Sequence, residues 1–364
     1  MIKGLVLELR KAFPGKKLII STVTPTGNKI AETLSLEGDL VTYLPLDLSF
    51  IVRRVIKKIR PCLFVIAETE LWPNLIQVLH DQHIPMAVVN GRISDGSYKG
   101  YHLIKAFLRS TLRVVDLFCV QSQRDRERLI ALGATADKVK VAGNMKFDLK
   151  IGAQDGPRGV LYRDKLGLSS KDKLLIAAST HFGEEEIILE IYFELLKQHK
   201  DLRLLIVPRH PERSDEVDKL VVKSGLKGLR ISLISQRPAG LDYRPVFILD
   251  TVGELMQYYA IADIVFVGGS LVKTGGHNIL EPGALGKPVL FGPQMFNFRD
   301  IADLFIENQA GIRVNYKEEL LSAIRGLLDD PGKAAELGRR ALELISCNQG
   351  ATQRTLDLIK GIIR

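Results

Sequence analysis

Two successive runs of alternating strand-like and helical patterns limit what this chain can fold into. The first run alternates amphipathic segments with the short apolar segments "KLIISTV", "DLVTYLPL", "CLFVIAET", "PMAVVNG", "DLFCVQS" and "KVKVAGN". The second run contains the segments "KLLIAAST", "LRLLIVP", "PVFILD", "DIVFVGG" and "KPVLFGP". Short apolar strands separated by helices are typical of parallel sheets that helices cover on both faces. The sequence therefore predicts an α/β protein with two Rossmann-like domains.

The segment "LKIGAQDGPRG" lies between the two runs and is rich in glycine and polar residues, which is typical of a domain boundary. We expect an N-terminal domain over residues 1–150 and a C-terminal domain over residues 151–364. Ligands of such folds bind beyond the carboxyl ends of the parallel strands. We therefore expect the two domains to face each other across a cleft that holds the binding site.

The charge of the chain favours anionic partners, because the 364 residues carry a net charge of +9. Phosphorylated ligands, a membrane surface and nucleic acid all satisfy that charge. No basic strand with interleaved aromatic residues and no recognition helix is visible, so nucleic acid is not expected. The three cysteines form no CxxC pair, which argues against a structural zinc site or a disulfide framework. No apolar run is long enough to span a bilayer.

The stretch "DIVFVGGSLVKTGGHNILEPG" carries the clearest sign of a ligand site. The glycine pairs Gly268–Gly269 and Gly275–Gly276 permit unusual backbone angles and close approach to the chain. A helix is expected to begin near His277 or Asn278, and its free amides would favour a phosphate. Glu281, one turn into this helix, could accept hydrogen bonds from ribose hydroxyls. The alternative is a plain glycine-rich connection whose acidic residue stabilises the helix dipole.

Two further loops follow strands of the same predicted sheet. In "LIVPRHPER", Arg209 comes directly after a strand, and its guanidinium suits a phosphate or a base. In "DTVGELMQYY", Gly253 permits close approach, and Glu254 stands at a helix start, where a contact with the helix dipole is the alternative role. Three polar loops at one edge of a sheet predict a nucleotide site.

Charged residues also follow strands of the first domain. Glu68 and Glu70 in "VIAETELWPNL" come after a strand, where charges need a partner or a function. Helix capping is the alternative role for these carboxylates. Lys146 in "VAGNMKFD" could neutralise a carboxylate or a phosphate in the cleft, and a plain surface lysine is the alternative.

Two helical segments of the first domain are strongly basic. "SFIVRRVIKKIR" and "KGYHLIKAFLRSTLR" each combine an apolar face with several cations. An apolar face is typical of a helix that covers a sheet. The unbalanced cations also suit contact with anionic lipid.

Seven motifs, in order along nearly the whole chain, resemble those of the bacterial 3-deoxy-D-manno-octulosonic acid (Kdo) transferases. They are "TPTG", "ETELWPNL", "GNMKFD", "STHFGEEE", "VPRHPER", "DTVGEL" and "FVGGSLVKTGGHNILEP". The resemblance implies a GT-B fold and an inverting glycosyltransferase that needs neither a metal nor a cofactor. It also implies transfer of Kdo from CMP-Kdo to a lipid A precursor, lipid IVA, in lipopolysaccharide biosynthesis. This reaction takes place at the cytoplasmic face of the inner membrane, whose anionic surface is an expected partner.

The resemblance also assigns roles to individual residues. Glu68 and Lys146 match the family's residues for transition-state stabilisation. The positions that match the CMP site are Pro208, Arg209, Val252, Gly253, Glu254, Asn278, Ile279, Leu280 and Glu281. They lie in the three loops that the residue pattern selects.

The start of the chain departs from the family pattern. Family members begin with a hydrophobic anchor, followed by a strand and a loop whose glutamate is the proposed general base, and this sequence starts after that point. Glu8 and Glu32 do not match that motif. We therefore expect a peripheral membrane protein that binds the donor and catalyses the transfer of Kdo poorly or not at all. A donor-binding protein without turnover and a UDP-sugar epimerase of the same architecture stay open as alternatives.

Overall fold

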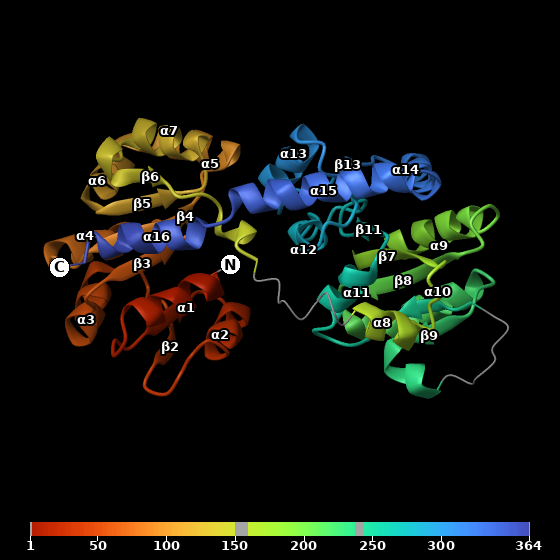
Figure 1. The fold of residues 1–364 in the computed structure, drawn as a ribbon. Coiled ribbons are helices and arrows are strands. Elements are labelled where there is room, and N and C mark those ends of the chain that lie inside the picture. The colour runs from red at the N-terminus through yellow and green to blue at the C-terminus, as the bar shows by residue number, and fades with distance from the viewer. Residues whose placement is uncertain (1, 150–158, 237–243, 364) are drawn as a thin grey trace. The chain divides into compact units, whose positions relative to one another are not determined.

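The computed structural model describes residues 2–149, 159–236 and 244–363. The chain divides into two compact units (Figure 1). The first unit comprises residues 1–148 and 348–364, and the second comprises residues 149–347. The expected linker falls largely on residues 150–158, which lie outside the described residues.

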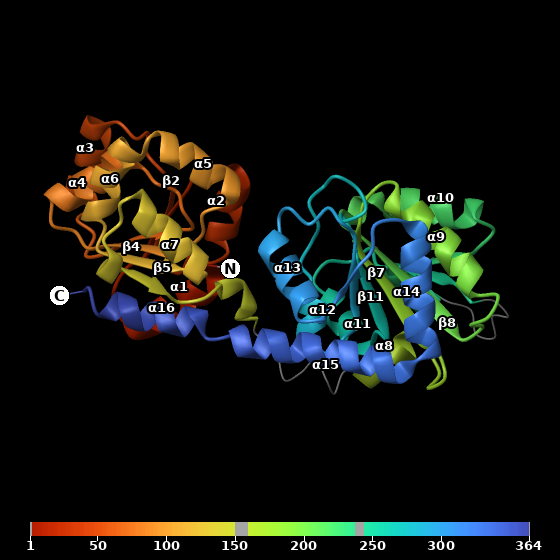
Figure 2. The ribbon, with the colours of Figure 1, turned by 90° about the horizontal axis from the view of Figure 1, so that it is seen from above.

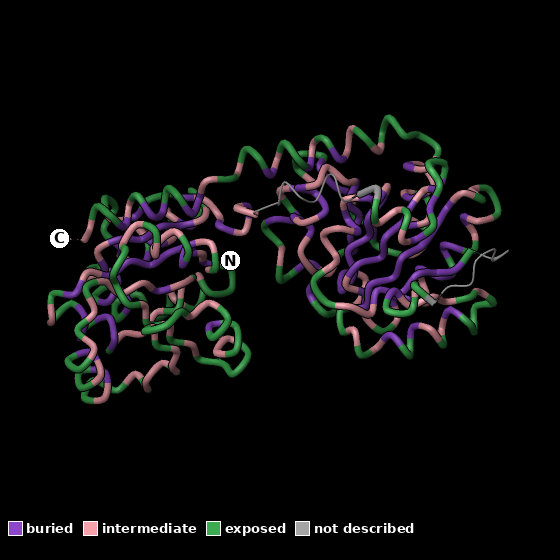
Figure 3. The backbone as a smooth tube through the Cα atoms, turned by 60° about the horizontal axis from the view of Figure 1, so that its bottom comes forward, coloured by how far each residue is buried: buried purple, intermediate pink, exposed green. Residues whose placement is uncertain are grey.

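The strands of the first unit are the six segments that the sequence predicts. Among its described residues, β3, β4, β5 and β6 form one parallel sheet in that order, and β1 and β2 form a separate parallel pair. Their bounds are β1 (Ile19–Thr22), β2 (Leu40–Tyr43), β3 (Phe64–Ala67), β4 (Met86–Gly91), β5 (Leu117–Val120) and β6 (Val139–Val141). Strands β4 and β5 are buried along their whole length, as continuous apolar runs require (Figure 3).

Helices cover both faces of this sheet. One core is formed by α3, α4, α6 and α7 with the sheet, and a second core lies under α1 and the last helix of the chain. The helices preceding the linker are α1 (Ile2–Ala12), α2 (Pro25–Glu32), α3 (Ser49–Ile59), α4 (Pro73–Asp81), α5 (Asp95–Leu103), α6 (Lys105–Val114) and α7 (Gln123–Leu132). Two 3₁₀ helices follow, η1 (Ala136–Lys138) and η2 (Met145–Phe147).

The last helix, α16 (Ala351–Lys360), differs from the expected division of the chain, which puts all of residues 151–364 in one domain. Its Ile359 packs in the core of the first unit with Leu5 of α1. Asp148 caps this helix, because its carboxylate accepts hydrogen bonds from the amides of Gly350 (2.6 Å) and Thr352 (2.5 Å). An amphipathic pattern shows that a helix covers a sheet, but it does not show which sheet.

The second unit contains a fully parallel sheet. Among the described residues its strand order is β13-β12-β11-β7-β8-β10-β9. The bounds are β7 (Lys173–Thr180), β8 (Leu202–Pro208), β9 (Gly228–Arg230), β10 (Val246–Ile248), β11 (Ile264–Val267), β12 (Val289–Phe291) and β13 (Ile312–Arg313). Among these strands, only the short β9 and β13 were not predicted from the sequence.

Helices α9, α10 and α14 pack together, as do α8, α11 and α12, and the sheet lies between the two groups (Figure 2). The helices are α8 (Gly159–Leu166), α9 (Glu184–Leu195), α10 (Ser214–Lys223), α11 (Leu255–Ile261), α12 (Leu280–Ala284), α13 (Arg299–Glu307), α14 (Lys317–Asp329) and α15 (Pro331–Asn348), with 3₁₀ helices η3 (Pro211–Arg213) and η4 (Ile231–Gln236). From β7 the chain continues to β8 and beyond, then returns to β11 on the other side of β7. Ligands of open α/β sheets bind at such a switch point, beyond the carboxyl ends of the strands.

Candidate functional site

Three loops leave the sheet of the second unit beside its switch point. Thr180 at the end of β7 pairs with Pro208 at the end of β8. His181, which follows β7, and Arg209, which follows β8, therefore lie at neighbouring strand ends. The amide of Arg209 donates to the carbonyl of Thr180 at 3.0 Å, which fixes this arrangement. Strand β11 lies on the other side of β7, and the loop of residues 268–279 leaves from its end.

The carboxylate of Glu184, at the start of α9, organises two of these loops. It is fully buried and accepts hydrogen bonds from the amides of His181 (3.0 Å), Gly269 (2.6 Å), Ser270 (3.0 Å) and Leu271 (2.9 Å). Buried carboxylates require such donors. The amides of Gly269, Ser270 and Leu271 therefore donate to a protein carboxylate, and the amide of Gly268 donates to the carbonyl of Ala178 at 2.7 Å, so none of these amides is free for a phosphate.

The glycines of this loop admit protein groups. A Cβ at Gly268 would lie 2.8 Å from the Oε2 of Glu184, and a Cβ at Gly269 would lie 2.8 Å from the Cδ2 of His277. Gly269 also has a φ of +64°, which favours glycine. The sequence signal of close approach was correct, but the groups that approach are a buried carboxylate and an imidazole.

The helix after this loop also differs from expectation. Helix α12 begins at Leu280 and has five residues, so its dipole is small. The amide of Leu280 donates to the Oδ1 of Asn278 at 3.1 Å, and the Nδ2 of Asn278 donates to the Oε1 of Glu281 at 3.0 Å. Asn278 therefore satisfies the amide of the first helical residue and holds the carboxylate of Glu281. Ile279 and Leu280 are fully buried, main chain included, so they can shape the site but expose no surface to a ligand in this structure.

Arg209 and Glu281 lie on two loops at the same edge of the sheet. Burial raises the pKa of Glu281, while the hydrogen bond from Asn278 and the charge of Arg209 act in the opposite direction. The side chain of Arg209 is exposed. The structure thus puts a guanidinium and a carboxylate on loops at the same edge of the sheet, beside the switch point.

The loop before α11 supplies Val252, Gly253 and Glu254. Val252 is 85% exposed, and Gly253 has a φ of +94° with open space where a Cβ would stand. The carboxylate of Glu254 accepts hydrogen bonds from Thr251 Oγ1 (2.5 Å) and Lys165 Nζ (3.2 Å). The hydrogen bond from Thr251, followed by Lys165, lowers the pKa of Glu254. Glu254 therefore joins this loop to α8, which is a structural role that the sequence analysis did not foresee.

Three histidines, none of them predicted from the sequence as a site residue, lie near Arg209. His181 follows β7, His210 follows β8, and His277 precedes α12. Burial, with the charge of Arg209 and the two other histidines, lowers the pKa of His277 to about 4. The sequence signal was present, because the motifs "STHF" and "PRHP" each put a histidine just beyond a strand, and "GGHN" puts one just before a helix.

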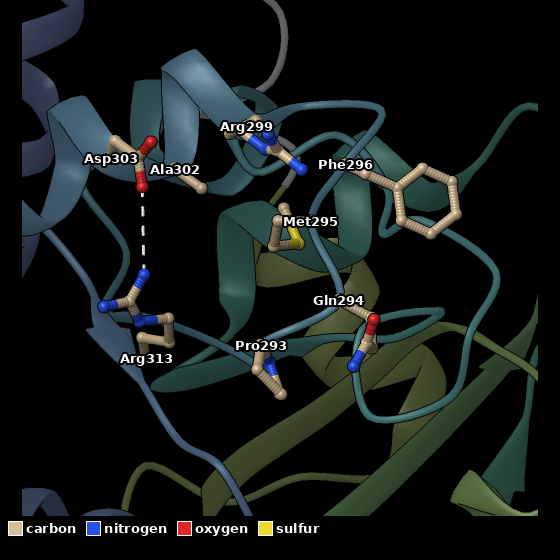
Figure 4. Close-up of a pocket in the computed structure, with 8 residues that line it drawn as sticks. All are labelled: Pro293, Gln294, Met295, Phe296, Arg299, Ala302, Asp303 and Arg313. Carbon is tan, nitrogen blue, oxygen red and sulfur yellow. Dashed lines mark ion pairs between the residues drawn. The ribbon is translucent and has the colours of Figure 1, made fainter. Parts of the chain in front are cut away.

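A small open pocket of about 170 Å³ lies beyond β12 (Figure 4). The backbone amide of Gln294 donates to the carbonyl of Ser270 at 2.9 Å, which joins this pocket to the glycine loop. Arg313 and Asp303 form an ion pair at 3.8 Å in its wall. The lining residues are Pro293, Gln294, Met295, Phe296, Arg299, Ala302, Asp303 and Arg313. None of the residues selected from the sequence lines it.

In the first unit, Glu68 and Lys146 lie at the carboxyl edge of one sheet. Glu68 follows β3, is exposed and has a φ of 60°, while its amide donates to Val89 O at 2.9 Å. A positive φ is strained for a residue with a side chain, and such strain is concentrated at functional sites. Lys146 lies on η2, whose Met145 amide donates to the Oδ1 of Asn90 at 3.0 Å.

Solved structures of two kinds share the fold. A glycosyltransferase from Rickettsia africae aligns with a TM-score of 0.62 at 16% identity, covering 100% of this chain and 95% of that one. A UDP-GlcNAc 2-epimerase from Neisseria meningitidis aligns with a TM-score of 0.63 at 14% identity, covering 99% and 96%. These likenesses, with the parallel sheets, confirm the predicted α/β class of the GT-B type.

Sequence relatives narrow this class. Residues 1–149 match the family model of 3-deoxy-D-manno-octulosonic-acid transferase (kdotransferase). The chain is 38% identical over 362 residues to the 3-deoxy-D-manno-octulosonic acid transferase of Haemophilus influenzae, covering 98% of this chain and 82% of the relative. The chain therefore belongs to the Kdo transferase family of glycosyltransferases, and the predicted family is confirmed.

Proposed function

We propose that this chain transfers Kdo from CMP-Kdo to a lipid A precursor, lipid IVA, in lipopolysaccharide biosynthesis. Membership of the Kdo transferase family supports the transferred sugar. The observation that carries the donor site is the placement of the loops of Arg209 and Glu281 beside the switch point, at the carboxyl ends of β8 and β11 on either side of β7. The residues proposed to form the CMP site are Pro208, Arg209, Val252, Gly253, Glu254, Asn278, Ile279, Leu280 and Glu281.

Each part of the proposed site has a different task. Arg209 binds the phosphate, because a guanidinium presents several donors to phosphate oxygens. Glu281, held by Asn278, accepts hydrogen bonds from the ribose hydroxyls. The exposed Val252 and the open backbone at Gly253 offer space for a base. Arg209 also supplies positive charge near the leaving phosphate, which supports transfer without a metal.

Glu68 and Lys146 are proposed to act in the transfer step, which we take to invert the anomeric centre. Lys146 balances the carboxylate of the acidic sugar or the charge of the departing phosphate. The strained backbone at Glu68 supports a functional role, because backbone strain that the surrounding structure maintains is concentrated at functional sites.

Replacing Glu68 by glycine tests this role against a purely structural one. Glycine adopts a φ of 60° without strain, so we expect the free energy of unfolding to stay unchanged or rise by about 1 kcal/mol. We also expect transfer from CMP-Kdo to lipid IVA to fall about 100-fold, because a charge at the reacting centre is lost. Transfer is measured with purified lipid IVA, and unfolding with urea.

The matched control is His83→Gly, because His83 also has a positive φ (54°) but stands between α4 and β4, at the opposite edge of the sheet. It should gain similar stability and keep full transfer. Equal transfer by the Glu68→Gly variant and the parent chain would exclude Glu68 from the reaction. Absence of transfer in the parent itself would favour a donor-binding protein without turnover.

We propose that α3 and the α5–α6 corner contact the anionic inner membrane. Phe50 is 73% exposed, Leu103 is 88% exposed and Phe107 is 61% exposed. Helix α4 packs against both α3 and α6, which keeps these helices on one side of the first unit. Helices α3 and α6 both carry basic residues, which favour contact with anionic lipid. Among the described residues, no helix is long and apolar enough to cross a membrane.

Replacing Phe50 or Leu103 by aspartate should weaken binding to vesicles that contain anionic lipid about tenfold, since each variant loses a buried apolar contact and gains repulsion. Sedimentation with the vesicles measures the bound fraction. Val222→Asp is the control, because Val222 is 62% exposed but lies on α10 of the second unit. If all three variants bind as the parent does, this surface does not meet the membrane.

A further inference from the structure

Two histidines from different strand ends meet directly at the switch point. The Nε2 atoms of His181 and His277 are 2.8 Å apart. Their rings lie in nearly parallel planes (1°), and the ring centroids are 5.1 Å apart. A centroid distance that exceeds the nitrogen distance by about two ring radii means that the rings meet edge to edge. They therefore form an N–H···N hydrogen bond, with no room for an ion between the two nitrogens.

This hydrogen bond constrains the protons of the pair. One Nε2 must carry a hydrogen and the other must accept it, so a neutral pair consists of two opposite tautomers. An additional proton can enter only at an outer Nδ1, and it gives a cation that the hydrogen bond stabilises. The pair can therefore change its charge by one without breaking the contact between the loops.

The charges around the pair decide when this proton is held. Burial lowers the pKa of both histidines, and nearby cations lower it further, while Glu184 raises that of His181. Glu184 already accepts four backbone hydrogen bonds. The groups that face the pair from neighbouring elements are Glu184, Arg209, His210 and Arg213. Without an anionic ligand the pair is neutral at pH 7, and an anion placed among these groups would reverse that balance.

We propose that the His181–His277 pair, together with Arg209, binds the phosphate of CMP and takes up one proton from solvent when CMP binds. The inference rests on the proposed function, in which CMP is the leaving group. The phosphate of CMP is a dianion near pH 7.5, and it would favour the charged form of an imidazole within contact distance. Because the complex then holds more protons than the free protein, the affinity for CMP should fall as the pH rises through the pKa of the bound pair.

Titration calorimetry at pH 7.5, in two buffers with different ionisation enthalpies, tests this proposal. We expect the parent chain to take up about one proton per CMP bound, and to take up none with cytidine, which has no phosphate. His181→Gln and His277→Gln should each abolish the uptake and weaken CMP binding about tenfold. His102→Gln, an exposed histidine of the first unit, is the matched control. The unfolding midpoint of each variant without ligand shows whether it has folded.

The results separate this inference from the function on which it rests. If the parent binds CMP, and a folded histidine variant keeps both the affinity and the proton uptake, the histidine pair does not bind the phosphate while the donor site stands. The same conclusion follows if cytidine causes the same uptake as CMP. If the parent does not bind CMP at all, both the inference and the proposed donor are wrong.

Discussion

Replacing Glu184 by glutamine should lower the free energy of unfolding of the second unit by about 3–5 kcal/mol. The carboxylate of Glu184 accepts four backbone hydrogen bonds in a fully buried position. Glutamine keeps one acceptor oxygen, and its amide group would face backbone N–H groups that can only donate. At least two buried donors would then be unsatisfied, and each costs about 1–3 kcal/mol.

Urea unfolding measures this loss, and Glu194→Gln is its control. Glu194 lies on the same helix but forms an exposed ion pair with Lys197 at 2.7 Å. Its replacement should change stability by less than about 1 kcal/mol. If Glu184→Gln unfolds at the same urea concentration as the control, the carboxylate does not hold the glycine loop, and the structural explanation of Gly268 and Gly269 fails.

Replacing Arg209 or Glu281 by alanine should reduce the affinity for CMP about 100-fold. Arg209 is proposed to make charge-assisted hydrogen bonds to the phosphate, and hydrogen bonds to charged groups are worth about 1.5–3 kcal/mol. Glu281 is proposed to bind the ribose, and it is already oriented by Asn278. Saturating CMP at about 100 times its Kd should stabilise the parent chain by about 2.7 kcal/mol, and either variant should lose most of this effect.

Thermal unfolding with and without CMP provides the measurement. Lys223→Ala is the control, because Lys223 is an exposed cation at the end of α10. UDP serves as the second ligand, since an epimerase of the same fold would prefer UDP. Full stabilisation by CMP in both the Arg209 and the Glu281 variants would refute the site assignment, and a preference for UDP would favour the epimerase.

Much of the fold could be predicted because the buried parallel strands are continuous apolar runs. Strand β8, for example, is buried at every residue and stands out as "LRLLIVP". Strands β9 and β13 could not be found, since they have three and two residues and are not fully buried. The position of α16 depends on contacts with α1, which is remote in sequence, and on the cap that Asp148 provides.

The candidate site was predictable only in part, because its contacts also join residues that are far apart in the sequence. The glycine pairs indicated that some group approaches the backbone, but at Gly269 that group is a carboxylate 85 residues earlier in the chain, and at Gly276 it is the side chain of Met295. A protein carboxylate and a ligand phosphate leave the same pattern of small residues in a loop. The contact between His181 and His277 joins residues 96 positions apart, so neither motif alone predicts it.

A crystal structure of the chain with bound CMP would test the central claim most directly. We predict the phosphate beside Arg209 and the His181–His277 pair, with the ribose hydroxyls within hydrogen-bond distance of Glu281. Density for CMP in the pocket lined by Arg299 and Arg313, or anywhere else away from the ends of β7, β8 and β11, would contradict the proposed donor site.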